Sequence, residues 1–220
     1  MKLVFLVSGN GGNLKFINKC IKYNYIKNVE LTVIADRECG ALKYARNKNI
    51  ESYKVKYVRN KNKELINLLL KLNPDIIITN IHKILDEEIV DLFYGKLINL
   101  HYSLLPAYPK MIGEAPIIKA IKETKFVGAT VHYVDVEVDS GEIIIQGLTK
   151  NVGKKEEIIN KIFRIGCLEL LFTLINKYPE IKSSKLGNSS KERDLIFSPS
   201  LNYNYEIFSE DFWEEVKQTK

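Results

Sequence analysis

The chain has 220 residues, of which 45% are hydrophobic and 27% are charged. This balance is that of an ordinary globular protein, and it excludes collagen-like, disulfide-scaffold and wholly disordered chains. The formal net charge is +6, and the basic residues are scattered without forming a block. Solubility and small anionic metabolites explain this charge better than nucleic acid as a partner.

The three cysteines, Cys20, Cys39 and Cys167, are far apart and show neither metal-ligand spacing nor a disulfide framework. Reduced thiols of this kind are typical of a cytoplasmic protein. The first apolar run is broken at Ser8, too early for a signal peptide, and no stretch approaches the roughly 20 apolar residues of a membrane helix. We therefore expect a soluble, cytoplasmic protein without a membrane partner.

The first hundred residues alternate short apolar runs, rich in β-branched residues, with amphipathic helical patterns. The predicted strands cover residues 2–7, 29–35, 52–55, 75–79 and 97–100. The predicted helices cover residues 14–23, 40–48, 61–72 and 86–94. Apolar strands that alternate with helices predict an α/β fold, with a mostly parallel, twisted sheet covered by helices on both faces.

After about residue 125 the pattern changes. Two strands at close range, 126–134 and 141–149, predict one antiparallel region of the sheet. A single long helix follows over residues 154–178, and Pro179 ends it.

The last part of the chain begins with a polar loop rich in serine, residues 182–190. Residues 195–220 then show a strand-like start, several aromatic residues and a short helix around Trp213. We predict a main domain over residues 1–182 and a C-terminal extension over 183–220. The aromatic content predicts that this extension docks on the main domain or on another subunit.

The first candidate site is the loop from Ser8 to Asn13, between the first predicted strand and the first predicted helix. Its glycines let the backbone turn sharply and present several N–H groups at the start of a helix, which favours an anion site. The loop lacks the third glycine of the dinucleotide fingerprint, and Asp36 does not stand in the usual ribose-binding context. An ordinary tight turn remains the alternative to a phosphate site.

The second candidate site is Asn99-Leu100-His101, at the end of the fifth predicted strand. Residues two apart in a strand point the same way, so Asn99 and His101 face one side at the carboxyl end of the strand. Open α/β sheets place their ligands at this edge. An amide donor beside an imidazole can stabilise an oxyanion and move a proton, although a structural role for a lone histidine is the alternative.

The remaining polar candidates are weaker. Asp139 lies in an Asp-Ser-Gly turn between two strands, which is ordinary turn chemistry. His82 follows a strand, and His132 lies inside one, where a satisfied core or surface histidine is a better interpretation than a ligand. Three histidines without close pairing argue against a zinc site.

Four blocks in chain order carry a resemblance: SGNGGNL, IHKILDEEIV, INLHYSLLPAYP and GATVHYVDVEVDSGEIIIQ. Over residues 2–178 the chain resembles the 10-formyltetrahydrofolate-dependent formyltransferases, and it is most similar to the glycinamide ribonucleotide formyltransferases of purine synthesis. The resemblance implies a Rossmann-like formyltransferase fold. It also implies 10-formyltetrahydrofolate as co-substrate, a primary amine on a phosphorylated small molecule as acceptor, and no metal.

The resemblance also implies site residues. The Asn-x-His pair and the turn aspartate of the family fall on Asn99, His101 and Asp139. Asn99 and His101 would stabilise the oxyanion, and Asp139 would keep His101 charged and accept the amine proton. The folate ring would be held by one segment and covered by one loop: Lys83, Ile84, Leu85, Asp135, Val136, Glu137 and Val138. The acceptor phosphate would be bound by Gly11, Gly12 and Asn13.

Departures from the purine enzymes concern the acceptor. Tyr102 replaces the proline of a His-Pro-Ser motif, a His-rich segment is missing after Pro109, and Gly166 and Cys167 align with a Glu-His pair that helps to hold the ribonucleotide. Glycinamide ribonucleotide therefore leads, and an amino-sugar nucleotide is the alternative acceptor. A sugar nucleotide would need an aromatic stacking surface, for which the candidates are Tyr102, Tyr108, Tyr203, Tyr205 and Trp213.

Two further functions are disfavoured. A non-catalytic folate- or nucleotide-binding module would not require Asn99, His101 and Asp139 together. A methionyl-tRNA formyltransferase usually carries a larger C-terminal RNA-binding domain than residues 183–220 can form. We expect no nucleic-acid partner, and the sequence leaves open whether the protein is a homodimer.

Overall fold

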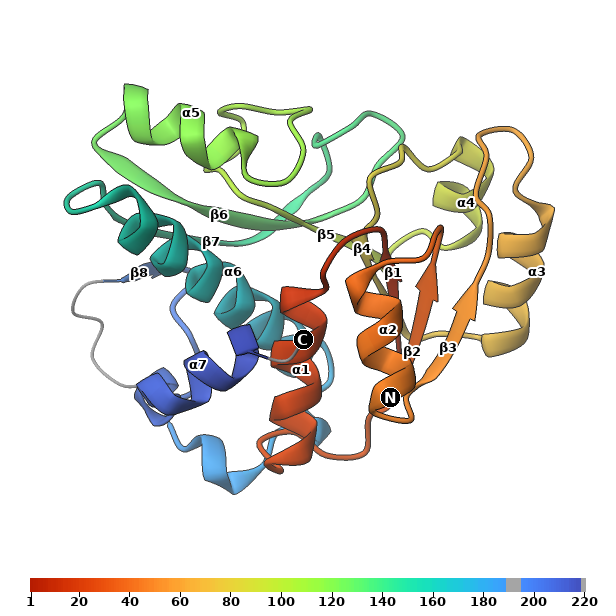
Figure 1. The fold of residues 1–220 in the computed structure, drawn as a ribbon, viewed down its shortest axis with the longest axis horizontal. Helices are drawn as coiled ribbons and strands as arrows, with labels where there is room; N and C mark the ends of the chain where they lie inside the picture. Colours follow the sequence, from red (N-terminus) through yellow and green to blue (C-terminus); the bar gives the residue numbers. More distant parts are fainter. Residues whose placement is uncertain (189–194, 219–220) are drawn as a thin grey trace. The chain divides into compact units, whose positions relative to one another are not determined.

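The computed structural model of the protein describes residues 1–188 and 195–218. They form two compact units (Figure 1). The first unit contains Met1–Asn99 together with the chain from Phe208 onward, and the second unit contains Leu100–Ile207. The predicted boundary between residues 182 and 183 stays a prediction. Parts of the predicted loop and extension, residues 189–194 and 219–220, lie outside the described residues.

The first unit is built on parallel strands in the order β3-β2-β1-β4-β5. The register places Val7 of β1 opposite Ala35 and Asn80, so the carboxyl ends of three strands lie at one edge. This confirms the predicted parallel sheet. The strands are β1 Lys2–Val7, β2 Glu30–Ala35, β3 Glu51–Lys54, β4 Ile76–Asn80 and β5 Leu97–His101, of which the last two residues belong to the second unit.

Helices cover both faces of these strands, as predicted. Each helix connects one strand to a parallel strand, and such connections are right-handed, which sends successive helices to a definite face. Figure 1 shows α1 and α2 on one side of the strands and α3 and α4 on the other. These helices are α1 Gly12–Lys22, α2 Gly40–Asn47, α3 Lys63–Leu72 and α4 Glu87–Leu92.

The second unit contains the predicted antiparallel region. Strands β6 Phe126–Tyr133 and β7 Ile143–Lys150 pair antiparallel, and β8 Ile196–Ser198 pairs antiparallel with β7. The long helix α6, Lys155–Lys177, packs on β6 and β7. An additional helix, α5 Ala115–Glu123, begins with proline in its first turn, where the missing N–H is tolerated. Short 3₁₀ helices cover Pro179–Ile181, Ser184–Leu186 and Tyr205–Ile207.

Two details of the second unit bear on its chemistry. The pairing of β6 and β7 shifts register between Val131 and His132, and such a bulge changes the direction in which the next side chain points. Glu169 of α6 is fully buried. Burial raises the pKa of this carboxyl well above its usual range, and the Gly147 backbone offsets only part of that rise.

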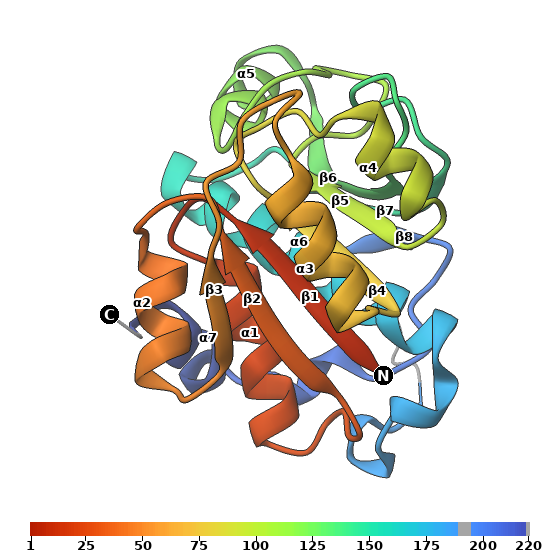
Figure 2. The same ribbon diagram turned by 90° about the vertical axis from the view of Figure 1, so that its right-hand side faces the viewer.

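The described end of the chain packs against α1 in the first unit. Helix α7, Glu210–Gln218, lies beside α1 in both views (Figures 1 and 2). The Trp213 ring stacks on Phe16 with centroids 5.2 Å apart, and Phe208 and Phe212 meet Phe16 edge-on. Lys19 of α1 forms an ion pair with Glu215. The predicted docking of the extension on the main domain is therefore confirmed for these residues.

Candidate active site

The second unit brings together His101, Asp139 and His132. The Nδ1 atom of His101 lies 3.4 Å from Oδ2 of Asp139, and the Nε2 atom of His132 lies 3.7 Å from Oδ1. Both rings are buried, with exposed fractions of 4% and 2%, and the aspartate side chain is 8% exposed. Asp139 has a φ of 60°, in the left-handed region that Asp adopts more easily than most residues. The turn therefore aims the carboxylate at the two rings.

The other nitrogen of each ring meets a backbone carbonyl. His101 Nε2 lies 2.9 Å from the Tyr108 oxygen, and His132 Nδ1 lies 2.8 Å from the Tyr133 oxygen. A carbonyl oxygen only accepts, so both of these nitrogens must carry a proton. Burial lowers the pKa of His132, and the Tyr133 carbonyl and Asp139 offset part of that effect.

The loop after His101 is tied to the loop that carries Asp139. The Lys110 backbone N–H donates to Asp139 Oδ2 at 2.6 Å, and the Lys110 ammonium lies 3.4 Å from the Glu137 carboxylate. The Ser140 hydroxyl donates to the Glu137 carbonyl, which closes the turn. Residues 135–137 are exposed, so this loop presents its backbone and side chains to solvent. Its predicted contact with a folate ring stays a prediction.

A buried hydrogen-bond network fixes the turn that follows His101. The Thr130 hydroxyl donates to the Ser103 carbonyl at 2.7 Å and accepts from the Leu105 backbone N–H at 3.0 Å. The Gln146 amide donates to the Leu105 carbonyl at 2.9 Å. Sequence reasoning missed Thr130 and Gln146. The available signal was a polar residue within each antiparallel strand, fully buried at Thr130 and half-buried at Gln146.

Asn99 belongs to the first unit and shares strand β5 with His101. The Thr79 hydroxyl lies 3.2 Å from Asn99 Oδ1 and also contacts the Ile98 carbonyl at 3.1 Å. Because Oδ1 faces this hydroxyl, the NH₂ group of the amide points away from Thr79. An amide NH₂ group is a hydrogen-bond donor, and the role of Asn99 in stabilising an oxyanion stays a prediction.

The predicted phosphate loop opens helix α1 in the first unit. Gly11 precedes the helix with a φ of 71°, and a Cβ there would lie 2.7 Å from Cβ of Ala41. Glycine is therefore required at this position for both conformation and space. The first turn of α1 has no side-chain cap and no acidic residue. Asn13 is 6% exposed.

The predicted folate segment, residues 83–85, adjoins that loop. The His82 backbone N–H donates to the Ser8 hydroxyl at 2.9 Å, which links the two segments within the first unit. Ser8 also bonds to Asp36, where burial favours the neutral acid but Arg37 and Ser8 hold the pKa of the carboxyl below its usual value. Asp36 is thus already paired with Arg37, through bonds of 2.7 and 3.0 Å.

Tyr57, in the loop after β3, contacts the predicted folate segment. Its hydroxyl donates to the Ile84 carbonyl at 3.1 Å and accepts from the Asp86 backbone N–H at 2.9 Å. Burial, followed by the nearby Asp86 carboxylate, raises the pKa of Tyr57 well above its usual value. The side chains of Lys83 and Ile84 are exposed, whereas Leu85 is buried. Sequence reasoning missed Tyr57, because nothing in the run of residues around it distinguishes it from a core aromatic residue.

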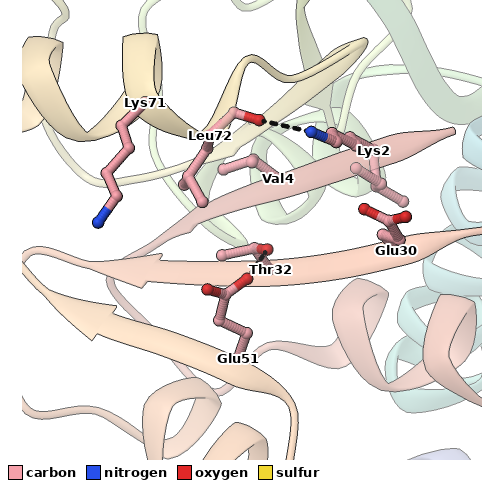
Figure 3. Close-up of a pocket in the computed structure, with 8 residues that line it drawn as sticks. Lys2, Val4, Glu30, Thr32, Glu51, Lys71 and Leu72 are labelled. Atoms are coloured by element: carbon pink, nitrogen blue, oxygen red, sulfur yellow. Dashed lines mark hydrogen bonds between the residues drawn. The ribbon is translucent and has the colours of Figure 1, made fainter.

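A separate hollow of about 150 Å³ lies on the first unit, away from these residues (Figure 3). Lys2, Lys71, Glu30 and Glu51 line it, together with Thr32, and their charges are of both signs. Thr32 donates to the Glu51 carboxylate at 2.9 Å, and the Lys2 ammonium contacts the Leu72 carbonyl. None of the predicted site residues lines this hollow.

Residues 1–188 and 195–218 contain no group of three or more His, Cys, Asp or Glu side chains arranged to hold a metal ion. Within the same ranges, no helix is both long and apolar enough to cross a membrane.

Comparison with known proteins identifies the family of this chain. The formyl transferase family profile matches residues 1–157, which include Asn99, His101 and Asp139. The chain belongs to the formyl transferase family. This assignment agrees with the mostly parallel sheet described above.

Individual relatives agree with this assignment. The chain is 28% identical over 174 residues to chloroplastic phosphoribosylglycinamide formyltransferase of Arabidopsis thaliana, covering 73% of this chain and 60% of the relative. It is 30% identical over 181 residues to phosphoribosylglycinamide formyltransferase of Mycobacterium tuberculosis, covering 79% and 83%. The crystal structure of phosphoribosylglycinamide formyltransferase from Anaplasma phagocytophilum matches with a TM-score of 0.67 at 26% identity, covering 84% and 86% of the two chains.

Proposed function

We propose that this protein transfers a formyl group from 10-formyltetrahydrofolate to the primary amine of a phosphorylated small molecule. The observation that carries the proposal is the buried pairing of His101 with Asp139, in a family member whose strand β5 also bears Asn99. At 3.4 Å the imidazole and the carboxylate are close enough for a hydrogen bond that tightens when substrates bind, and such a pair can hold and move one proton. An amide NH₂ adds a second donor for a developing negative charge.

In the proposed reaction the amine attacks the formyl carbon and a tetrahedral oxyanion forms. The Asn99 NH₂ and the His101 ring donate to this oxyanion, and one such donor is typically worth about 3 to 4 kcal/mol. The amine loses its proton to Asp139, directly or through water. The C–N bond to the folate then breaks as the oxyanion collapses, and the folate nitrogen takes the proton that Asp139 received, directly or through water, which restores the carboxylate.

The Tyr108 carbonyl bears on this step. In this structure it accepts a hydrogen bond from His101 Nε2, at 2.9 Å. We infer that the formyl oxygen replaces this carbonyl as the acceptor when substrates bind. The loop that carries Tyr108 would then have to shift, and its residues Tyr108 and Lys110 both have positive φ angles.

For the folate we propose the two segments that the sequence indicated. Residues 83–85 would hold the ring through backbone groups, because the Lys83 and Ile84 side chains are exposed and Tyr57 fixes the backbone. Residues 135–138 would close over the ring, since this loop is exposed and is tied to the catalytic aspartate by Lys110.

For the acceptor we propose glycinamide ribonucleotide, bound by phosphate at Gly11, Gly12 and Asn13. The uncapped, acid-free first turn of α1 supports an anion at this loop, because helix N-terminal N–H groups carry partial positive charge. The names of the similar proteins from Arabidopsis thaliana, Mycobacterium tuberculosis and Anaplasma phagocytophilum agree with this acceptor.

One observation favours an amino-sugar nucleotide instead. Tyr102, next to His101, is half-buried, and a Cβ at Gly166 would lie 3.0 Å from its ring. Glycine inside a helix costs about 1 kcal/mol relative to alanine, so the glycine in α6 makes room for this ring at some expense to the helix. The ring offers the acceptor an aromatic surface.

The C-terminal candidates for that surface are corrected by the structure. Tyr203 is fully buried and donates to the Leu168 carbonyl at 2.7 Å, and Trp213 is 4% exposed and stacks on Phe16. Both rings are buried in the apolar core, so neither is exposed for stacking with a ligand. Tyr205 is half-buried and packs against Phe197. Only Tyr102 and Tyr108 remain beside His101.

The deciding experiment is an acceptor assay with the purified protein and 10-formyltetrahydrofolate. Glycinamide ribonucleotide and dTDP-4-amino-4,6-dideoxyglucose are supplied in parallel, and both tetrahydrofolate release and the formylated product are measured. We expect turnover with one of the two acceptors, and glycinamide ribonucleotide is the one we favour. Absence of any formylated product with a range of phosphorylated amines would contradict the proposed activity.

A further inference from the structure

The inference concerns His132, and it rests on the proposed function. Asp139 stands between two imidazoles, and its two carboxylate oxygens are divided between them. His101 Nδ1 and the Lys110 backbone N–H face Oδ2, at 3.4 and 2.6 Å, whereas His132 Nε2 faces Oδ1 at 3.7 Å. A carboxylate held from both sides in this way has one orientation.

The carbonyl contacts determine which nitrogens are left to meet the carboxylate. The outer nitrogens, His101 Nε2 and His132 Nδ1, must donate to the Tyr108 and Tyr133 carbonyls. In a neutral ring the inner nitrogen is then an acceptor, and it would face a carboxylate oxygen that also only accepts. Two acceptors at this distance repel each other inside a buried site, so each contact needs a proton of its own to be attractive.

The cluster has few other charges around it. Lys110 faces Asp139 through its backbone, while its ammonium pairs with Glu137 on the exposed loop. The Lys177 ammonium of α6 lies over the Tyr133 ring, 5.1 Å from its centroid. Thr130 and Gln146 on the two neighbouring strands are neutral. The side chains that face the Asp139 carboxylate directly are therefore the two imidazoles, His101 and His132.

We propose that His132 is a positioning residue of the reaction: its Nε2, when it carries a proton taken from solvent, forms an ion pair with Asp139 Oδ1 at 3.7 Å, which orients the carboxylate toward His101. The register shift between Val131 and His132 turns the ring toward the Asp139 turn. Loss of this proton at higher pH places a lone pair against Oδ1, and the carboxylate leaves the orientation that supports His101. Because burial lowers the pKa of His132, we expect this loss at a lower pH than for an exposed histidine.

Two variants test this proposal through turnover. His132→Leu removes the contact, and we expect kcat to fall tenfold or more, with the KM of each substrate within twofold of the original. His132→Gln keeps a neutral donor toward Oδ1 that does not titrate. We expect it to restore kcat to within threefold of the unmodified protein, and to move the alkaline limb of the kcat profile up by at least half a pH unit.

Other outcomes would overturn the proposal. Unchanged kcat and pH profile in His132→Leu would remove any role for the residue. A His132→Gln protein that keeps its thermal stability but is no better than His132→Leu would show that a donor toward Asp139 is not what matters. An unshifted alkaline limb in His132→Gln would show that loss of the His132 proton does not set that limb.

A second measurement does not depend on activity. Ring ¹⁵N spectra of the full chain contain signals from only three histidines, and the exposed His82 serves as the internal reference. We expect His132 to keep a proton on Nδ1 throughout, and its titration to shift in Asp139→Asn while that of His82 does not. An unshifted His132 titration would refute the proposal, even if the protein formylated no acceptor and the proposed function failed.

Discussion

The two regions proposed to act on the acceptor are built in opposite ways. The loop at Gly11, in the first unit, offers backbone N–H groups and depends on the absence of side chains. The cluster around Asp139, in the second unit, consists of buried side chains, each held by a further hydrogen bond. Binding of a phosphate requires space beside the backbone and a positive electrostatic potential. Transfer of a proton requires fixed distances between donor and acceptor atoms. This difference predicts which substitutions act on KM and which act on kcat.

The largest effect is expected in the buried cluster. His101→Ala and Asp139→Asn should each lower kcat about a hundredfold or more. Each variant lacks a side chain that is proposed to carry a proton in the reaction, whereas the residues proposed to bind folate and acceptor are unchanged. Single-turnover and steady-state rates, with folate binding measured separately, check this. Near-normal turnover in either variant, or a loss of folate affinity as large as the loss in kcat, would contradict the proposal that the buried cluster acts on kcat.

The backbone loop should respond in KM. Gly12→Val places a branched side chain at the first residue of α1, and we expect the acceptor KM to rise about tenfold or more while the folate KM changes little. Lys22→Val, at the exposed far end of the same helix, is the matched control. If both variants behave alike, or if kcat alone falls, the loop does not bind the acceptor phosphate.

A smaller effect is expected at the folate segment. Tyr57→Phe removes the hydroxyl that bonds to Ile84 and Asp86, so the folate KM should rise severalfold. Lys83→Ala should change it by less than about threefold, since the segment is proposed to bind through its backbone. Folate titration of both variants measures this. A severe loss in Lys83→Ala, with Tyr57→Phe unaffected, would assign the contact to the lysine side chain.

The smallest effect on turnover is expected at Glu169, which titrates in the same unit as the cluster. Its folded-state pKa is raised, so only the unfolded chain releases this proton as pH rises above about 4.3. The free energy of unfolding therefore falls by about 1.4 kcal/mol per pH unit until the folded-state pKa is reached.

Glu169→Gln should remove that fall in stability and leave kcat at the pH optimum unchanged. Denaturant unfolding between about pH 5 and 8 measures it. If the unmodified protein and the variant show the same pH dependence of stability, Glu169 does not titrate as its burial implies. A change in kcat would instead connect Glu169 to the cluster.

Much of the fold was predictable because its signals are local. Apolar β-branched runs and helical spacing placed the parallel strands and their helices to within a few residues, as with β1 at residues 2–7. The antiparallel pair and the long helix α6 also followed from periodicity and Pro179. Helix α5 was not assigned, since it is short and lies in a stretch dominated by loop residues.

The site was predictable only in part. Strand spacing and resemblance indicated Asn99, His101 and Asp139, but the contact of His132 with Asp139 depends on a bulge that leaves no signal in the sequence. Tyr57 acts on residues 27 or more positions away, and such long-range hydrogen bonds cannot be read from local pattern. Tyr203 and Trp213 were predicted as candidates for a stacking surface, but both are buried. Their exposure depends on residues far away in the chain that pack against them, which the local sequence does not show.

The stacking of Trp213 on Phe16 has a consequence for synthesis of the chain. The first unit is formed by two separate stretches of the chain, and the second unit is the stretch between them. At about 5 to 20 residues per second, a ribosome needs about 10 to 40 seconds to travel from Phe16 to Trp213. During that interval Phe16 of α1 lacks the aromatic rings of Phe208, Phe212 and Trp213 that cover it in the folded protein, so this face of the nascent first unit stays uncovered until α7 has been made.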